Sequence, residues 1–181
     1  VCTAAIVMAF LGYAGEWRTL LPSEPLMGDA CARISEGWSV MIKLDDFVPL
    51  SAENCSQLAT DTRLVSGLEQ VMASPEGLLE AQRLALLDVV NSAAWILVVI
   101  LLEIEVRVLT RWGAGLRPAT RMTNAFKMML YATLVVAAIY WGFKGDFLDF
   151  WDAALWLFAF IFIELNVFEW QREIRDQSAA T

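Results

Sequence analysis

Long runs of apolar residues alternate with short charged segments along this chain of 181 residues. A helix needs roughly 20 apolar residues to cross about 30 Å of hydrocarbon, and residues 83–106, 124–143 and 148–168 reach that length. Residues 1–15 form a shorter run. Because the chain begins with Val1 rather than Met, we expect residues before it, which would make this run part of a longer helix. A cleaved signal peptide is the alternative and would place Val1 outside.

These runs predict an all-α fold, an integral membrane antiparallel bundle of four transmembrane helices. Inside a bilayer each backbone polar group must be satisfied within its own segment, so the spans are expected to be helices. The helix of residues 1–15 is the partial one. A turn at residues 144–147 joins the last two spans, and residues 169–181 form a tail.

The connection between the runs 83–106 and 124–143 is basic and contains no acid. Its bases are Arg107, Arg111, Arg117, Arg121 and Lys127. Lysine and arginine beside a span resist translocation, so the loop 107–123 and the tail are predicted to be cytoplasmic and residues 16–82 extracytoplasmic. We take the membrane to be the bacterial inner membrane.

Composition agrees with this interpretation, since 58% of the residues are hydrophobic and the mean hydropathy is +0.53. The net charge of −8 is unevenly distributed, with eleven acids and five bases in residues 13–83. Five bases beside a bilayer favour anionic lipid and an orienting role. The expected partners are therefore membrane lipids and other membrane subunits or copies of the same chain, and not nucleic acid.

The segment 16–82 is too short to predict a core of its own. Residues 56–72 have the apolar spacing of a helix. Further on, Ser74 is a candidate N-cap and Pro75 a candidate first helical residue, so a helix is predicted to lead without a break into the span 83–106.

Cys31 and Cys55 both fall in the extracytoplasmic segment, 24 positions apart. An oxidising compartment would allow them to form a disulfide, which we predict. Closing a loop of this length stabilises by about 3 kcal/mol in the chain-entropy model. Two buried free thiols are one alternative. A redox role like that of quinone-linked disulfide-forming membrane enzymes is another, disfavoured because no Cys-x-x-Cys is present.

Histidine is absent from the whole chain. This removes the usual axial ligand of haem, the commonest zinc ligand and the usual base of nucleophilic triads. No phosphate-binding loop and no carboxylate cluster with metal-site spacing stands out. We therefore predict neither enzymatic activity nor a metal or cofactor site. Bound lipid, or a quinone or pigment held by aromatic packing, stays open.

Polar residues within or beside the spans are the candidate functional residues, since ionisable groups at such depth are costly and usually functional. They are Asp88, Asn91, Glu103, Glu105, Asp152, Glu164 and Asn166. Helical spacing places two groups of residues on one face each. The first face holds Asp88, Ser92, Trp95, Val99 and Glu103, and the second holds Asp152, Trp156, Phe160 and Glu164.

Structural pairing competes with an ion or proton pathway, and with contacts to another subunit, as the role of these acids. The expected pairs are Glu103 with Arg107, Glu105 with Arg111, and Glu164 with Lys127 or with an inner-boundary arginine of a neighbouring span. The middle of the second and fourth spans holds no ionisable residue. A proton path there would need water or a partner to bridge the gap.

Two resemblances follow from these features. The run from Glu103 and Glu105 to Arg107, with Asp152 in a later span, resembles the acidic countercharges of voltage-sensing domains, although no helix carries an arginine at every third position. The layout of four spans with two cysteines in a long first outer segment is similar to claudin-like tetraspan proteins. Their Gly-Leu-Trp-x-x-Cys signature is absent, so this resemblance implies topology alone.

The leading hypothesis is a non-catalytic polytopic membrane protein, an accessory or structural subunit of a homo- or hetero-oligomeric complex. Its ten Phe and eight Trp favour packing of helix faces. The alternative is a small ion or proton channel or transporter that uses the acidic faces of the second and fourth spans. A membrane enzyme or redox protein ranks third because histidine is absent.

Overall fold

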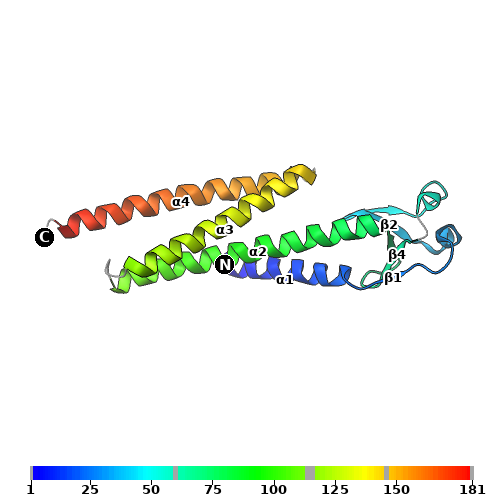
Figure 1. Ribbon diagram of the computed structural model, residues 1–181, viewed down its shortest axis with the longest axis horizontal. Coiled ribbons are helices and arrows are strands. Elements are labelled where there is room, and N and C mark those ends of the chain that lie inside the picture. The colour runs from blue at the N-terminus through cyan, green and yellow to red at the C-terminus, as the bar shows by residue number, and fades with distance from the viewer. Residues whose placement is uncertain (1, 59–60, 113–116, 145–146, 180–181) are drawn as a thin grey trace. The chain divides into compact units, whose positions relative to one another are not determined.

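The computed structural model describes residues 2–58, 61–112, 117–144 and 147–179, which form two compact units (Figure 1). The first unit is residues 1–92 and the second is residues 93–181. Helix α2 (Pro75–Trp112) belongs to both.

The first unit is built on a mixed β-sheet. Its elements are α1 (Cys2–Leu20), β1 (Ser23–Pro25), the 3-10 helix η1 (Ala30–Glu36), β2 (Ser39–Lys43), β3 (Asp46–Pro49), the 3-10 helix η2 (Cys55–Gln57), β4 (Arg63–Val65), β5 (Val71–Ala73) and the start of α2. The strands lie in the order β1-β4-β5-β2-β3; β2 and β5 are parallel and the other neighbours antiparallel. The predicted all-α bundle is therefore wrong.

The sheet separates two small apolar cores. One core lies between the sheet and the helices and contains Leu20 of α1 together with Leu78, Ala81 and Ala85 of α2. The other lies between the sheet and the disulfide-linked segment and contains Ala30, Leu50 and Cys55. Successive residues of β2 and β5 alternate between these cores, as side chains of a strand must. The segment thus has cores of its own, contrary to the sequence expectation.

The helix predicted over residues 56–72 is also wrong. That stretch contains the end of η2, strand β4 and the start of β5. Its helix-like apolar spacing arises because Leu58 and Met72 enter one core while Val65 and Leu68 join the other. Strands of three residues buried from both sides give no alternation of apolar and polar positions. The apolar positions of this stretch therefore have the spacing of a helix although the segment is not helical.

The predicted disulfide is confirmed. Cys31 in η1 is bonded to Cys55 in η2, with 5.1 Å between the Cα atoms. Local hydrogen bonds fix the backbone near each of the two cysteines. Asp29 caps η1 by accepting a hydrogen bond from the Cys31 N–H (3.0 Å), and Asn54 accepts one from the Ser51 N–H (2.8 Å). Because both cysteines join the same core, the bond fixes an outer layer on the sheet.

Both outer edges of the sheet carry a proline. In β1 the flanking hydrogen-bonded positions are Pro22 and Leu26, so the backbone of Pro25 points away from β4. In β3 the Leu50 N–H donates to the Trp38 carbonyl, so Pro49 points away from β2 in the same way. Each edge therefore lacks an N–H donor at an outward position.

The predicted start of α2 is confirmed. Pro75 is its first residue, and the Ser74 hydroxyl accepts a hydrogen bond from the Gly77 N–H at 3.1 Å. A serine at the N-cap satisfies one of the free donors of the first turn, and proline fits the next position because it needs no donor there. The helix then continues without a break to Trp112.

The second unit contains the rest of α2 with α3 (Arg117–Lys144) and α4 (Phe147–Ala179). Ala94 and Val98 of α2 pack with Leu130 and Leu134 of α3 in its core. Within the described residues, two helical stretches are long and apolar enough to cross a membrane, Pro75–Ile104 and Met122–Lys144. Helix α4 contains a shorter apolar stretch, Phe150–Ile163, so the prediction of four spans is wrong.

Two contacts fix the end of α1 to the rest of the first unit. The Gln82 side chain of α2 donates a hydrogen bond to the Leu20 carbonyl (2.8 Å), satisfying an acceptor that the helix end leaves open. Gly67, in the turn between β4 and β5, lies directly against the Thr19 backbone, and a β-carbon there would overlap the Thr19 carbonyl group.

We predict that Gly67→Ala destabilises the first unit by about 1–3 kcal/mol, because the added methyl group forces two backbones apart. The measurement is thermal unfolding of the purified protein in mild detergent. Gly15→Ala is the matched control, since its β-carbon meets no atom within 4 Å and alanine is the better helix former. Equal melting temperatures for the two variants would contradict this account of the contact.

Candidate functional site

The two faces predicted to carry the polar residues meet through their aromatic centres. Trp95 of α2 contacts Trp156 of α4 edge to face, with ring centroids 6.4 Å apart, and Phe160 with centroids 4.7 Å apart. Leu157 and Phe160 also pack on the core formed by α2 and α3. Such aromatic pairs contribute about 0.5–1.5 kcal/mol each beyond the area they bury. The middle of these two faces therefore meets through apolar aromatic side chains.

The predicted pair of Glu103 and Arg107 is confirmed. Arg107 Nη2 lies 2.6 Å from Glu103 Oε1, and Arg107 Nε donates to the same oxygen at 2.7 Å. The two side chains are 60% and 73% exposed for Glu103 and Arg107 respectively. A pair of this kind along one helix contributes about 0.3–0.5 kcal/mol in water. The pair neutralises the charge of Glu103 within its own helix.

Polar groups in the middle of the membrane-capable stretch Pro75–Ile104 of α2 differ in how they are satisfied. The Ser92 hydroxyl hydrogen-bonds to the carbonyls of Asp88 (2.8 Å) and Val89 (3.0 Å). Asn91 Oδ1 is buried and has no hydrogen-bond partner within the described part of the chain. A buried unsatisfied oxygen costs about 1–3 kcal/mol. Asn91 is thus the one predicted candidate left with an unmet polar atom among those whose side chains are described.

The remaining predicted residues are not brought together. Asp152 and Asn166 are exposed on α4. The side chains of Glu105, Glu164, Arg111, Arg117 and Arg121 lie outside the described residues. Among the side chains that are described, no three or more Cys, Asp or Glu residues form a group able to hold a metal ion.

Lys127 has a different place from the one its sequence context suggests. It belongs to helix α3, within the membrane-capable stretch Met122–Lys144, and its side chain is only 5% exposed. It has an interaction partner, as do Thr123 and Tyr131, one turn away on either side. A buried ammonium is tolerated only when paired. Its position in the sequence, close to the basic loop, does not reveal this burial.

Glu16 and Asp45 form a carboxyl pair that the sequence did not indicate. Glu16 lies on α1, and Asp45 lies in the two-residue turn between β2 and β3, where its φ of 62° is left-handed. Burial raises the pKa of Glu16, and the negative charge of Asp45 and a hydrogen bond to it raise that pKa further. Only the folded hairpin brings these carboxyls together, so no spacing in the sequence reveals them.

Comparison with protein family models, with curated proteins and with solved structures finds no match to this chain. Its function must therefore be argued from its own residues. Within the described part of the chain, these residues include an aromatic contact between α2 and α4, the buried Lys127 and the carboxyl pair of Glu16 and Asp45.

We predict that the first unit loses stability as pH rises through the raised pKa of Glu16. At a pH below the ordinary pKa of glutamate, Glu16 is protonated in both the folded and the unfolded chain. Its full contribution to folding stability is present there. At higher pH folding must hold a charged Glu16 beside Asp45. Glu16→Gln should reduce this pH dependence, because the amide stays neutral and can still donate to Asp45. Denaturant unfolding between pH 4 and pH 8 measures it.

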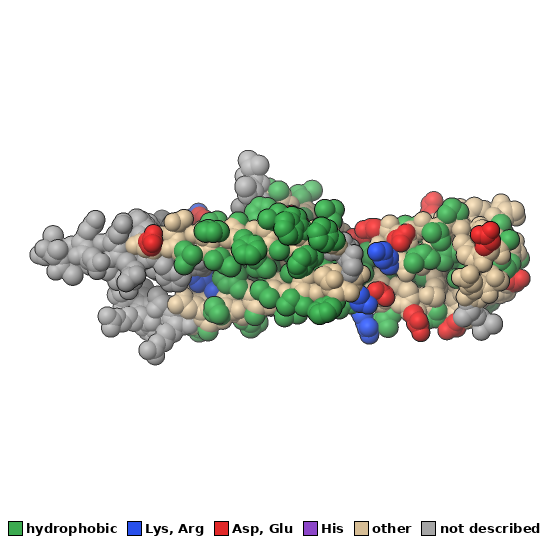
Figure 2. Space-filling view, turned by 90° about the horizontal axis from the view of Figure 1, so that it is seen from above, with side chains coloured by type: hydrophobic (Ala, Val, Ile, Leu, Met, Phe, Trp, Pro, Cys, Tyr) green, Lys and Arg blue, Asp and Glu red, His purple; other side chains and the backbone are tan. Residues whose placement is uncertain are grey.

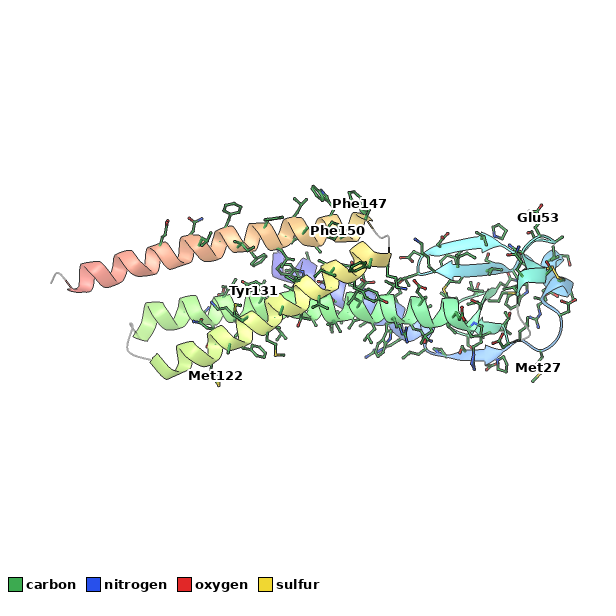
Figure 3. The ribbon with its side chains drawn as sticks, turned by 45° about the horizontal axis from the view of Figure 1, so that its top comes forward. Met27, Glu53, Met122, Tyr131, Phe147 and Phe150 are labelled. Atoms are coloured by element: carbon green, nitrogen blue, oxygen red, sulfur yellow. A yellow bond between two sulfur atoms is a disulfide. The ribbon has the colours of Figure 1, made fainter. Side chains whose placement is uncertain are left out.

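The control for this titration is Glu53→Gln, which removes an exposed carboxylate from another loop, seen at the far end of the sheet unit in Figure 3. It should leave the pH dependence in place. A Glu16→Gln protein whose stability changes with pH as much as that of the unmodified protein would refute the assignment to this pair.

Lys127 supplies a second prediction. If it pairs with Glu164, as the sequence suggests, Lys127→Met should destabilise the second unit by about 1–3 kcal/mol by leaving the acid unpaired. Adding Glu164→Leu should then recover part of the loss. A double-mutant cycle on unfolding in detergent should give a coupling energy above about 0.5 kcal/mol. Strictly additive effects would show that Lys127 has another partner.

Proposed function

We propose that this chain is a non-catalytic membrane subunit that packs against copies of itself or against other membrane proteins. Helices α2 and α3 cross the bilayer, and the disulfide-stapled sheet unit lies on its outer face. The observation that carries the proposal is the exposure of the apolar stretches of α2 and α3. Only 28% of the apolar window in Pro75–Ile104 and 33% of that in Met122–Lys144 is buried within the chain, whereas the core helix of a soluble protein is mostly buried.

Exposed apolar side chains continue over α3 and α4. Those of α4 include Phe147, Leu148, Trp151, Leu155, Trp156, Phe158, Ile161, Phe162, Ile163 and Leu165. Figure 2 shows hydrophobic side chains gathered over the helices and acidic ones over the sheet unit. Soluble monomers rarely expose so large a contiguous apolar surface, which marks contact with lipid or protein.

Two features support the proposed orientation. The bond between Cys31 and Cys55 is typical of oxidising compartments outside the cytoplasm. The bases that follow α2's apolar stretch favour a cytoplasmic position for the connection to α3. A bacterial inner membrane would meet both conditions.

The aromatic contact between α2 and α4 favours a subunit over a channel. Trp95, Trp156 and Phe160 occupy the middle of the contact between the two candidate faces, and Glu103 is compensated by Arg107. An ion path needs convergent polar groups or water at that level. The channel hypothesis remains as the alternative, supported by the buried Lys127.

Topology is tested with single cysteines introduced at Ser51 and Ala114 in a chain whose native cysteines are replaced. The Ser51 position should react with an impermeant maleimide in intact cells. The Ala114 position should react only after the membrane is opened. The reverse pattern would overturn the orientation.

Native mass spectrometry of the particle extracted in mild detergent tests the subunit role. We expect several copies of the chain or defined companion proteins. A bare monomer would contradict the proposal. Ion or proton flux through liposomes containing the pure chain, lost in Glu164→Gln, would favour the channel instead.

A further inference from the structure

Helix α1 presents an exposed stripe that ends in an arginine. Going toward the sheet, the stripe consists of Ala4, Met8, Leu11, Gly15 and Arg18, which are all exposed and advance by steps of three or four residues. Arg18 is its first charged member. Glu16 lies on another face, half-buried beside Asp45.

Helix α2 repeats this arrangement in the opposite direction. Its exposed stripe runs from Val90 through Leu86 to Arg83, and then to Leu79 and Glu76 beside the sheet. Arg83 is the first charge met after the apolar positions. Each helix therefore changes from exposed apolar residues to an exposed arginine on its outer face.

The two arginines lie at the same level along the helix pair. The hydrogen bond from Gln82 to the Leu20 carbonyl sets the register of the two helices. Arg18 precedes Leu20 by two residues and Arg83 follows Gln82 by one, and both steps lead away from the sheet. At about 1.5 Å per residue, each arginine therefore lies within about one helical turn of this hydrogen bond along its own helix.

Neither guanidinium group has a polar partner within the described residues. Arg107 is paired with Glu103, whereas within the described residues neither Arg18 nor Arg83 makes a hydrogen bond or an ion pair. The surrounding segment is rich in acids that could have neutralised them. Guanidinium groups bind phosphate through two parallel hydrogen bonds. An anion from outside the chain is the natural ligand.

We propose that Arg18 and Arg83 bind the phosphates of lipid head groups at the outer leaflet, which fixes the depth at which the sheet unit stands. This rests on the proposed membrane function. A phospholipid is the one anion that also accounts for the apolar stripes continuing directly from both arginines. Tyr13 and Trp17, on the same helix end, are residue types that favour the same interfacial level.

The test measures retention of phosphatidylglycerol by the full chain in mild detergent, using native mass spectrometry during a lipid titration. Arg18→Gln with Arg83→Gln should lower the apparent affinity by about 30-fold, the loss expected for two bases at an anionic lipid surface. Arg33→Gln with Lys43→Gln removes the same charge elsewhere in the first unit and should leave the affinity unchanged. Equal affinity in both double variants would overturn the proposal.

Two further arms separate the causes of failure. Inorganic phosphate at millimolar concentration should not displace the lipid; displacement would assign the arginines to a free anion instead. Extraction of membranes with alkaline carbonate reports insertion independently of lipid binding. If the unmodified chain is extracted, the membrane function itself fails. If it stays in the membrane and both double variants bind lipid equally, only the role of the two arginines is refuted.

Discussion

The structure depends on the burial of the first turns of α2 against the sheet. Leu78, Ala81 and Ala85 are almost completely inaccessible and contact residues of the strands and of α1. Two alanines on this face let helix and sheet approach closely, and the capped start at Ser74 sets where that face begins. Because α2 continues unbroken into its apolar stretch, the position of the sheet along the helix follows from this packing. The disulfide layer and the end of α1 are added around it.

Local features of the fold could be predicted from the sequence, whereas the sheet could not. The cap at Ser74 and Pro75, the pair of Glu103 and Arg107, and the disulfide each depend on short spacing or on chemistry that few residue types offer. The sheet has strands of three to five residues, one parallel pairing and neighbours distant in sequence. Its central strand β5 is buried throughout. Such strands leave no period in the sequence.

The candidate site was predictable to a similar extent. Helical spacing correctly placed Trp95 on one face of α2 and Trp156 and Phe160 on one face of α4, and these side chains do contact one another. The spacing could not show that Lys127 is buried, because burial depends on which helices pack around it. The contact of Glu16 with Asp45 depends on a hairpin that was not predicted at all. Tertiary structure decides both.

The prolines at the two sheet edges have a consequence for crowding. Chains confined to a bilayer meet repeatedly in one plane with their extramembrane parts at similar heights, a situation that invites exposed strands to join into a continuous sheet. Pro25 and Pro49 remove a donor from each outward edge, so neighbouring sheet units cannot fuse through a full ladder of hydrogen bonds. Association is left to side chains, so in the membrane location proposed above the chains can lie close together while each sheet stays separate.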